Sequence, residues 1–315
     1  MTSIPWRSIQ LRVTLFTLGI FLAGVWSLSV VASRMLQDDM QAIVGAQQFS
    51  TVSTIAAELN HQIEDRLRAL EDVAASIDTE TLANTGALQA QMERQVVFQR
   101  MFNAGFFVTR ADGVPIADVP ITAKRYGLGV AERDYMIAAL QQGRTTVGKP
   151  VVGKSLRTPV FSMAAPIRDP QGLVIGAVVG VTNLNAASFL NKVTEHGYGR
   201  SGDYFIASLQ HRLNVTSSDK TRVMQPLPPL GANPYVDRFV DGYEGTVHYV
   251  GQRGVEILVS VKGIPAAGWA MVATLPTAEA FAPIHAMQQR VLWGTVLLTL
   301  LALSLIHISE PTRPY

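Results

Sequence analysis

An uncharged apolar run, residues 13–33 (VTLFTLGIFLAGVWSLSVVAS), constrains this chain more than any other feature. About 20 consecutive apolar residues suffice for a helix to cross the hydrocarbon core of a bilayer. Only 16% of all residues are charged, against about 25% in typical soluble domains. The run therefore predicts a first transmembrane helix. A cleaved signal peptide is the alternative, but the run is long for one and no clean cleavage site is evident.

The charges beside this run predict its orientation. Arg7 and Arg12 precede it, whereas Asp38 and Asp39 follow it. Because positive residues collect on the cytoplasmic side of a membrane, residues 1–12 are predicted to be cytoplasmic. The chain that follows the run is then extracytoplasmic.

A second apolar run, residues 291–306, follows Arg290 and predicts a second transmembrane helix over residues 285–308. The run itself is slightly short for a full span. Residues 309–315 are polar and unlike what precedes them. We interpret them as a truncated or artefactual end, with a native short tail as the alternative.

Between the two runs, residues 37–77 predict one long amphipathic helix. No proline interrupts the segment, and its apolar residues recur at a spacing of three or four. This helix would form a dimer stalk or pack along its own domain, and both can hold. A shorter helix is predicted over residues 87–99, so that residues 34–94 comprise the stalk and the connecting helix.

Two regions of β-type sequence follow the helices. In the first, residues 104–109, 159–167 and 174–182 predict strands, residues 133–142 predict a helix that ends at Gly143, and residues 187–195 predict a further helix. The second region predicts strands over residues 202–207, 245–250, 256–261 and 269–275. The expected fold class is α+β, with two antiparallel-sheet units in tandem behind a long N-terminal helix.

Short motifs recur in a characteristic order along the first region. Arg-Asp-Tyr opens a helix at residue 133, Gly-Lys-Pro follows at 148, Pro-Val-Phe-Ser at 159, Ala-Ala-Pro-Ile-Arg-Asp at 164 and Gly-Leu-Val-Ile-Gly at 172. With a membrane span on each side, the chain resembles the double Cache (tandem PAS-like) sensor domains of bacterial diguanylate cyclases, sensor histidine kinases and chemoreceptors. The resemblance covers residues 36–280 and implies a membrane-distal PAS-like unit (95–196) and a membrane-proximal one (197–284).

The resemblance also implies a ligand site in the distal unit. Family members that bind amino acids use an Arg-x-Trp-Tyr motif, to which Arg133 and Tyr135 are similar, and a later aspartate that holds the amino group. Thr182 stands at that acidic position. An arginine suits a carboxylate because its planar fork donates two parallel hydrogen bonds. Without the aspartate, an organic anion is favoured over a free amino acid.

Other residues are assigned by their positions. Tyr126, Phe161 and Thr182 are candidate pocket liners. Lys154 and Arg157 lie on the loop before residue 159, where they either cap a ligand or are solvated charges. The competing interpretation of the motif is that Arg133 pairs with an acid at the helix start and Tyr135 belongs to the core.

The sequence offers no catalytic residues. Six histidines occur without an HExxH or H-x-H arrangement, and neither a G-x-S-x-G elbow nor a Walker A loop is present. The absence of cysteine excludes disulfides, thiolate metal sites and cysteine nucleophiles. A net charge of +2, without a Lys/Arg-rich run, does not suggest a nucleic-acid partner. We therefore expect no enzyme activity, metal or cofactor within these residues.

The expected function is small-molecule sensing at a bacterial inner membrane, with residues 34–288 outside it. By resemblance, the expected partners are a small organic anion, the bilayer and a second copy of the chain. A cytoplasmic output domain would be a diguanylate cyclase first or a histidine kinase second. The alternative is a membrane-anchored scaffold that binds protein and no small molecule.

Overall fold

The computed structural model describes residues 9–195, 197–251 and 254–309. They divide into two compact units, one built from the described parts of residues 1–46 and 277–315 and the other from Gln47–Pro276. The predicted tail falls almost wholly outside the described residues, as does most of the predicted cytoplasmic N-terminus.

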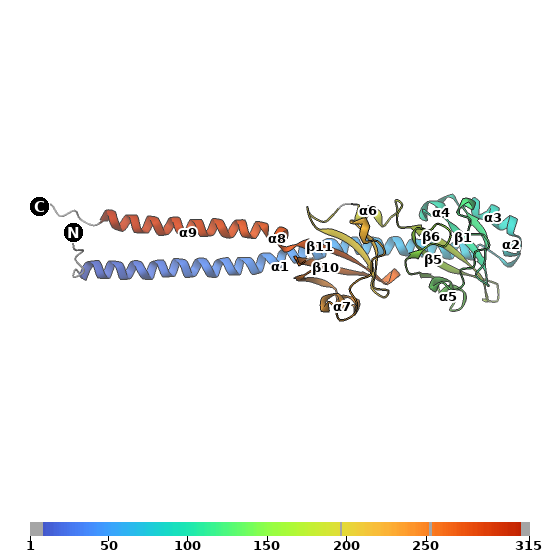
Figure 1. The fold of residues 1–315 in the computed structure, drawn as a ribbon, viewed down its shortest axis with the longest axis horizontal. Helices are drawn as coiled ribbons and strands as arrows, with labels where there is room; N and C mark the ends of the chain where they lie inside the picture. Colours follow the sequence, from blue (N-terminus) through green and yellow to red (C-terminus); the bar gives the residue numbers. More distant parts are fainter. Residues whose placement is uncertain (1–8, 196, 252–253, 310–315) are drawn as a thin grey trace. The chain divides into compact units, whose positions relative to one another are not determined.

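The first unit contains the two apolar helices. Helix α1 runs over Ile9–Ala75 and α9 over Ala282–Ser309, preceded by the short α8 (Thr277–Ala280) (Figure 1). Both long helices contain a stretch apolar enough to cross a membrane, with mean hydropathies of 1.8 and 1.2. Large apolar side chains, such as Phe16 and Trp293, are more than two-thirds exposed, as expected for helices that face lipid.

Hydrogen bonds join these two helices within their unit. The Trp26 indole donates to the Thr299 hydroxyl at 3.2 Å, and the Ser29 and Thr295 hydroxyls lie 2.9 Å apart. Polar side chains of this kind pair across helices in membranes. The sequence predicted separate helices over residues 13–33 and 37–77, and α1 joins them without a break.

The second unit packs two sheets on the rest of α1. Short helices α2 (Thr79–Ala83), α3 (Thr85–Glu93) and α4 (Val96–Met101) follow α1, so the single helix predicted over residues 87–99 is two. The buried face of α1 includes Val52, Ala56, Leu59, Ile63 and Leu70, all at most 1% exposed. Their three-to-four spacing is the predicted apolar stripe, and it packs on the domain rather than standing free.

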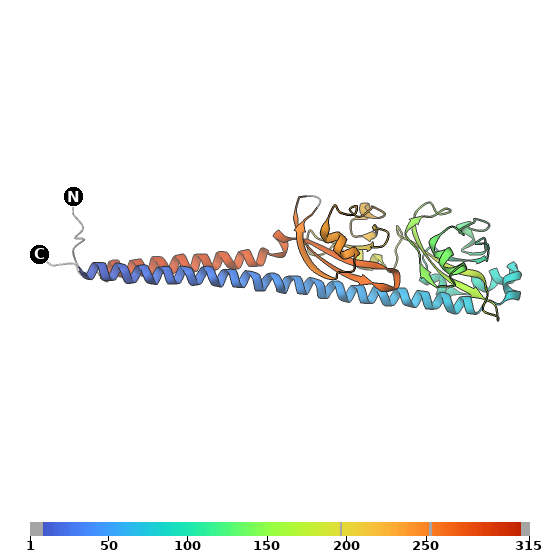
Figure 2. The same cartoon turned by 90° about the horizontal axis from the view of Figure 1, so that it is seen from below.

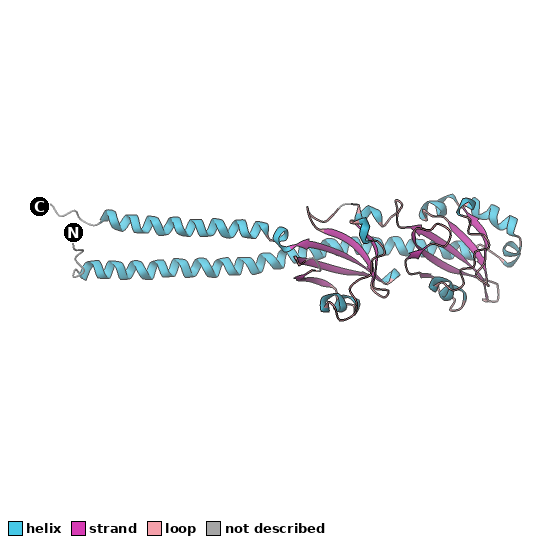
Figure 3. Cartoon of the chain, viewed as in Figure 1, coloured by secondary structure: helices cyan, strands magenta, loops and turns pink. Residues whose placement is uncertain are grey.

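The first sheet is antiparallel and has the order β2-β1-β6-β5-β3, with β4 also paired to β5. Its strands are β1 (Phe106–Arg110), β2 (Pro115–Val119), β3 (Thr146–Val147), β4 (Val151–Val152), β5 (Pro159–Arg168) and β6 (Val174–Asn183). The 3-10 helix η1 (Ile121–Ala123) and helix α5 (Asp134–Leu140) lie between β2 and β3 in the chain. Figure 3 shows the sheet with helices on both faces.

The second sheet, also antiparallel, has the order β8-β7-β11-β10-β9. Its elements are β7 (Asp203–Ser208), β8 (Leu213–Ser217), η2 (Lys220–Arg222), α7 (Pro234–Val240), β9 (Gly245–Val250), β10 (Glu256–Ile264), η3 (Pro265–Ala267) and β11 (Trp269–Pro276). It is anchored on α1, because Gln48 donates to the Ala273 carbonyl at 3.0 Å and Asn60 accepts from the Ala266 amide at 2.9 Å. Figure 2 shows both sheets along this part of α1.

The α+β fold with a long N-terminal helix and two antiparallel sheets was correctly predicted. The sequence missed β2, β8 and α7, and the helix predicted over residues 187–195 is only α6, Asn191–Thr194. β2 and β8 are five-residue strands whose side chains are nearly all buried. β2 (PIADV) lacks the alternation of apolar and polar residues that signals a half-exposed strand, whereas β8 (LNVTS) has this alternation but is short.

Candidate functional site

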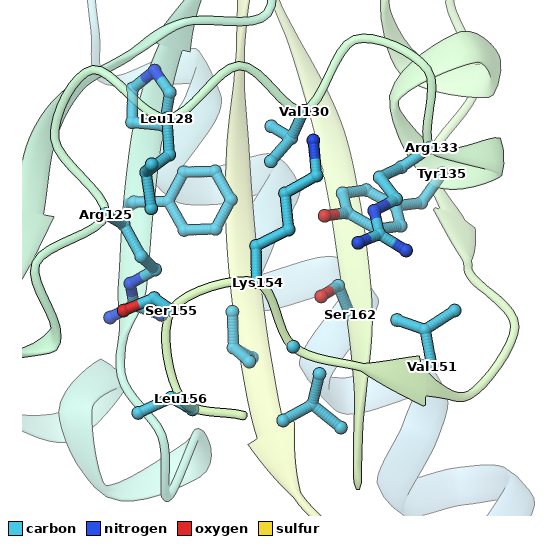
Figure 4. Close-up of a pocket in the computed structure, with 15 residues that line it drawn as sticks. Arg125, Leu128, Val130, Arg133, Tyr135, Val151, Lys154, Ser155, Leu156 and Ser162 are labelled. Carbon is cyan, nitrogen blue, oxygen red and sulfur yellow. The ribbon is translucent and has the colours of Figure 1, made fainter. Parts of the chain in front are cut away.

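A cavity lies on the face of the first sheet that carries α5. Its empty space, including open solvent at the mouth, is about 520 Å³. The floor consists of sheet residues, among them Phe107 of β1, Ser162 of β5 and Val181 of β6, and the cover consists of the loops before α5 and before β5 (Figure 4). The fifteen lining residues are Phe107, Pro115, Arg125, Leu128, Val130, Arg133, Tyr135, Val151, Gly153, Lys154, Ser155, Leu156, Val160, Ser162 and Val181.

Backbone hydrogen bonds hold the loop before α5 over the sheet. The Val130 amide donates to the Gly113 carbonyl at 3.2 Å, and the Gly127 amide donates to the Pro115 carbonyl at 3.1 Å. Gly113 has a φ of +75°, and a Cβ there would lie 2.7 Å from the Ala131 methyl group. Glycine therefore provides both the left-handed turn between β1 and β2 and the close approach of the covering loop.

Arg133 and Tyr135 enter the cavity from the start of α5. Arg133 has an extended backbone at the N-cap position, and its side chain is 20% exposed. Tyr135 is buried and hydrogen-bonds to Ser162, and burial raises the pKa of its phenol. The phenol is therefore neutral at physiological pH and available as a hydrogen-bond donor.

The Gly-Lys-Pro motif at residues 148–150 packs against the start of α5. The Lys149 amide donates to the Asp134 carboxylate at 2.8 Å. A Cβ at Gly148 would lie 2.6 Å from the Tyr135 ring, so a larger residue would displace the tyrosine. The two motifs that were noted separately in the sequence thus form one packed element.

Arg125 lines the other side of the cavity as half of a buried ion pair. Its Nε donates to the Asp118 carboxylate at 2.8 Å, and its backbone amide donates to the other carboxylate oxygen at 2.8 Å. The two side chains are only 8% and 1% exposed. Burial lowers the pKa of Arg125, although Asp118 opposes this shift. The guanidinium also lies 5.3 Å from the Phe107 ring centroid.

Lys154 extends across the mouth between the two arginines (Figure 4). Its Nζ lies 2.6 Å from the Glu132 carboxylate and donates to the Gly129 carbonyl at 2.7 Å. Glu132 also lies 3.5 Å from Arg133 Nε. The Lys154 hydrogen bond is the main cause of the lowered pKa of Glu132. Glu132 is therefore a charged acid on the rim of the cavity, and its carboxylate interacts with both Lys154 and Arg133.

The structure places some of the predicted site residues at the cavity and others away from it. Arg133 and Tyr135 both line the cavity, as expected, and Arg133 has an acidic neighbour in Glu132, as the competing interpretation expected. Phe161 pairs in register with Thr182, which puts both on the same sheet face. Phe161 makes edge-to-face contacts with Phe189 and Trp269 in the core on the α1 side, so this face is not the cavity side.

The residues adjacent to these two predictions line the cavity instead. Ser162 and Val181 pair with each other one position away in β5 and β6 and face the opening. Tyr126 is 64% exposed and does not line the cavity, nor does Arg157. Lys154 does line it, while its side chain is 42% exposed and paired with Glu132.

Sequence reasoning missed Arg125 and Ser162. The Ser162 position was accessible in principle, since it alternates with Phe161 along a strand that had been located. Arg125 lies in a loop without periodicity, and its acid partner Asp118 belongs to a strand that the sequence did not reveal. No pattern in the sequence connects these two residues.

The lining defines what the cavity can hold. Arg125, Arg133 and Lys154 contribute positive charge, Tyr135 and Ser162 contribute hydroxyls, and most of the other liners are apolar. None of the fifteen liners is acidic. Within the described part of the chain, no group of three or more His, Cys, Asp or Glu residues is placed to hold a metal ion. The cavity suits a small molecule with an apolar body and a negative charge.

The Cache domain family, represented by dCache_1, matches residues 37–284. None of the curated proteins compared matches the sequence.

Solved structures share the fold at low sequence identity. The extracellular ligand-binding receptor of Desulfohalobium retbaense is 17% identical with a TM-score of 0.56, covering 72% of this chain and 40% of that one. The ligand-binding domain of the Pseudomonas aeruginosa amino acid chemoreceptor PctC, in complex with GABA, is 21% identical with a TM-score of 0.55, covering 72% and 97%. The extracellular domain of mmHK1S-Z3, designated a histidine kinase, is 13% identical with a TM-score of 0.61, covering 78% and 98%.

Proposed function

The chain belongs to the Cache domain family, and on this premise we propose that its cavity senses a small organic anion outside a bacterial inner membrane. The family assignment makes residues 37–284 an extracytoplasmic small-molecule sensing domain of the kind found in chemoreceptors and sensor histidine kinases. The domain itself is non-catalytic. Its flanking apolar helices are consistent with membrane anchoring.

One observation carries the choice of ligand class. Arg133 lines the cavity beside Tyr135 and Ser162, among fifteen liners without a carboxylate. A carboxylate placed there would accept two parallel bonds from the guanidinium and a third from the phenol. An ammonium group would find hydroxyls and apolar side chains but no negative partner in the lining. The acid on the rim, Glu132, is already bonded to Lys154.

A relative of known structure binds a ligand that carries an amino group as well as a carboxylate. PctC is an amino acid chemoreceptor solved in complex with GABA, which carries both an amino group and a carboxylate. In this chain the carboxylate partner is present as Arg133, and Thr182, at the expected acidic position, faces away from the cavity. This supports an organic anion over a free amino acid.

Signalling requires that the ligand bind one conformation of the domain more tightly than another. Gln48 of α1 donates to the Ala273 carbonyl of β11. In the sequence, Gln48 follows the apolar stretch of α1, and β11 is followed by α8 and the apolar helix α9. The proposal includes a cytoplasmic output domain, a diguanylate cyclase first and a histidine kinase second; mmHK1S-Z3, whose extracellular domain shares this fold, is designated a histidine kinase. A homodimer through exposed positions of α1 belongs to the same proposal.

The proposal is tested by ligand screening and one substitution. We expect organic acids, but not amines or purines, to raise the melting temperature of the purified chain, because a ligand stabilises the state that binds it. Arg133→Ala will weaken binding about 10- to 100-fold, since a hydrogen bond to a charged group contributes about 1.5–3 kcal/mol. Isothermal titration calorimetry measures the loss.

A matched control distinguishes this effect from general charge loss. Arg157 lies in the loop that follows Lys154 but does not line the cavity, so Arg157→Ala will leave the affinity unchanged. Equal losses in the two variants would contradict the proposed site. If no small molecule stabilises the chain, the scaffold interpretation replaces it.

Glu132 provides an independent prediction. Because its carboxylate competes with the ligand for Lys154 and Arg133, Glu132→Gln will tighten anion binding about 2- to 5-fold, the scale of an exposed ion pair. Titrations at low and high salt check this, since the gain must shrink as salt screens the charges. Glu244→Gln, which removes an acid paired with Lys262 in the second sheet, is the control and will change nothing.

A further inference from the structure

Arg125 forms part of the cavity wall, but its hydrogen bonds are directed into the protein. Its Nε bonds to Asp118, and its Nη2 donates to the Val119 carbonyl at 3.2 Å. Its Nη1 is buried, out of reach of a molecule in the cavity. The whole residue is only 7% exposed, and its guanidinium lies beside the Phe107 ring. A ligand therefore meets Arg125 as a surface and not as a hydrogen-bonding partner.

The other residues on this side of the cavity are largely apolar. Figure 4 shows Leu128, Ser155 and Leu156 on the side of Arg125, across the opening from Arg133. The Ser155 hydroxyl is already engaged, because it donates to a backbone carbonyl of the neighbouring loop. A polar group placed here would lose its hydration without gaining a matching partner, which is costly. The side of the cavity away from Arg133 thus suits a hydrocarbon.

The charges around the cavity limit the ligand to one carboxylate. Three cations line it, namely Arg125, Arg133 and Lys154. Two acids outside the lining, Asp118 and Glu132, pair with these cations. One positive charge of the three is left, and a single carboxylate at Arg133 balances it. A second carboxylate would have to be buried beside Arg125, whose charge Asp118 already neutralises, and this is unfavourable.

From these observations we propose that the ligand is a monocarboxylate with a hydrocarbon tail, and that the Asp118–Arg125 pair excludes acids that carry a second charge. The proposal rests on the proposed function and names the class of organic anion. The carboxylate lies at Arg133 and Tyr135, and the tail extends toward Leu156. Asp118 determines specificity through Arg125, without touching the ligand.

The test titrates matched acids into the full chain in lipid nanodiscs, with empty nanodiscs to measure how much of each acid enters the lipid. The alkanoates run from propanoate to hexanoate. Pentanoate is compared with 4-oxopentanoate and glutarate, and hexanoate with adipate. We expect the affinity to rise about 4-fold with each methylene group of the tail that is buried. Each alkanoate will bind about 10-fold or more tightly than the oxo acid or dicarboxylate of the same length, because these bring an unpaired polar group to the apolar side.

Leu156→Ala tests the position of the tail. Loss of this side chain will weaken hexanoate binding about 10-fold and will flatten the dependence on chain length, because less apolar surface is buried. Leu173, on the turn between β5 and β6, is 67% exposed and does not line the cavity. Leu173→Ala removes the same atoms from the surface and will leave the chain-length dependence unchanged. Equal effects of the two substitutions would contradict the position assigned to the tail.

Asp118→Asn tests the role of the buried pair. With its counter-ion removed, the charge of Arg125 attracts a second carboxylate, so the ratio of hexanoate to adipate affinity will fall about 10-fold. The ratio is the readout because a loss of folded protein weakens the binding of both acids equally. Asp112→Asn, which removes an exposed acid that does not line the cavity, will keep the wild-type ratio. If Asp118→Asn does not fold, the wild-type series and Leu156→Ala still decide the class of ligand.

Any of three further results would overturn the proposal. Tightest binding by an oxo acid or a dicarboxylate in the wild type would place a polar partner on the side that we assign to the tail. Affinities that do not rise with chain length would mean that the tail is not buried in the cavity. An unchanged ratio in a folded Asp118→Asn variant would show that the buried pair does not exclude the second charge. These results leave the proposed function intact, whereas failure of every carboxylate to bind would overturn both.

Discussion

Replacing Asp118 with asparagine will lower the free energy of unfolding by about 3–5 kcal/mol, the cost of leaving one charge of a buried ion pair without its partner. Asp118 is 1% exposed and accepts two hydrogen bonds from Arg125, one from the side chain and one from the backbone amide. An asparagine amide has one oxygen and would turn its NH₂ group toward one of these donors. Urea denaturation followed by near-ultraviolet circular dichroism measures the loss.

The neighbouring turn offers a matched control. Asp112 pairs with Arg110 at 2.9 Å, but both side chains are more than half exposed. Because exposed ion pairs contribute only about 0–1 kcal/mol, Asp112→Asn will change the unfolding free energy little. The Asp118 and Asp112 variants remove the same charge from the same arginine–aspartate chemistry. Similar losses of unfolding free energy in the two variants would show that burial of the Asp118–Arg125 pair is not the source of its stabilising effect.

Phe161→Ala will also cost about 3–5 kcal/mol of unfolding free energy, as large-to-small changes in well-packed cores do. Phe161 is fully buried and lies 5.0 Å from Trp269, ring centroid to ring centroid. This contact connects β5 of the first sheet with β11 of the second, so its loss leaves a void between them. The measurement is again urea denaturation, paired with titration of the best-binding carboxylate.

The same variant separates a core role from a ligand role. Phe161 faces the α1 side of the sheet, so at a temperature where the variant stays folded we expect its affinity for the carboxylate to remain within about twofold of wild type. Phe161→Leu, which keeps much of the volume, will restore part of the stability. A large loss of affinity in a variant that keeps its stability would return Phe161 to the ligand site.

The two apolar helices, the long helical stretch that follows the first of them and most strands follow from the sequence because they are local patterns. Each of these patterns indicates its structure from a single segment of the chain. They are the apolar run at residues 13–33, the three-to-four spacing along α1 and the β-type runs around residues 159–183. Arg133 and Tyr135 were found for the same reason, since they stand together at the start of a short helix.

The rest of the candidate site depends on contacts between segments. A strand pattern locates β5 and β6, but only their pairing and the packing of α1 decide which alternate residues face the cavity. For this reason Phe161 and Thr182 were expected where Ser162 and Val181 lie. A shift of one residue along a strand exchanges the two faces.

The sequence by itself determined an α+β sensor domain flanked by two apolar helices, with an arginine and a tyrosine at the start of one short helix. Only the tertiary structure brought Arg125 and Lys154, from two different loops, to the cavity that Arg133 enters. The direction of a loop side chain cannot be predicted from periodicity. The groups that bond to Arg125 and Lys154, on Asp118 and Gly129, lie on other segments. Ligand chemistry therefore became readable only when these side chains were placed in space.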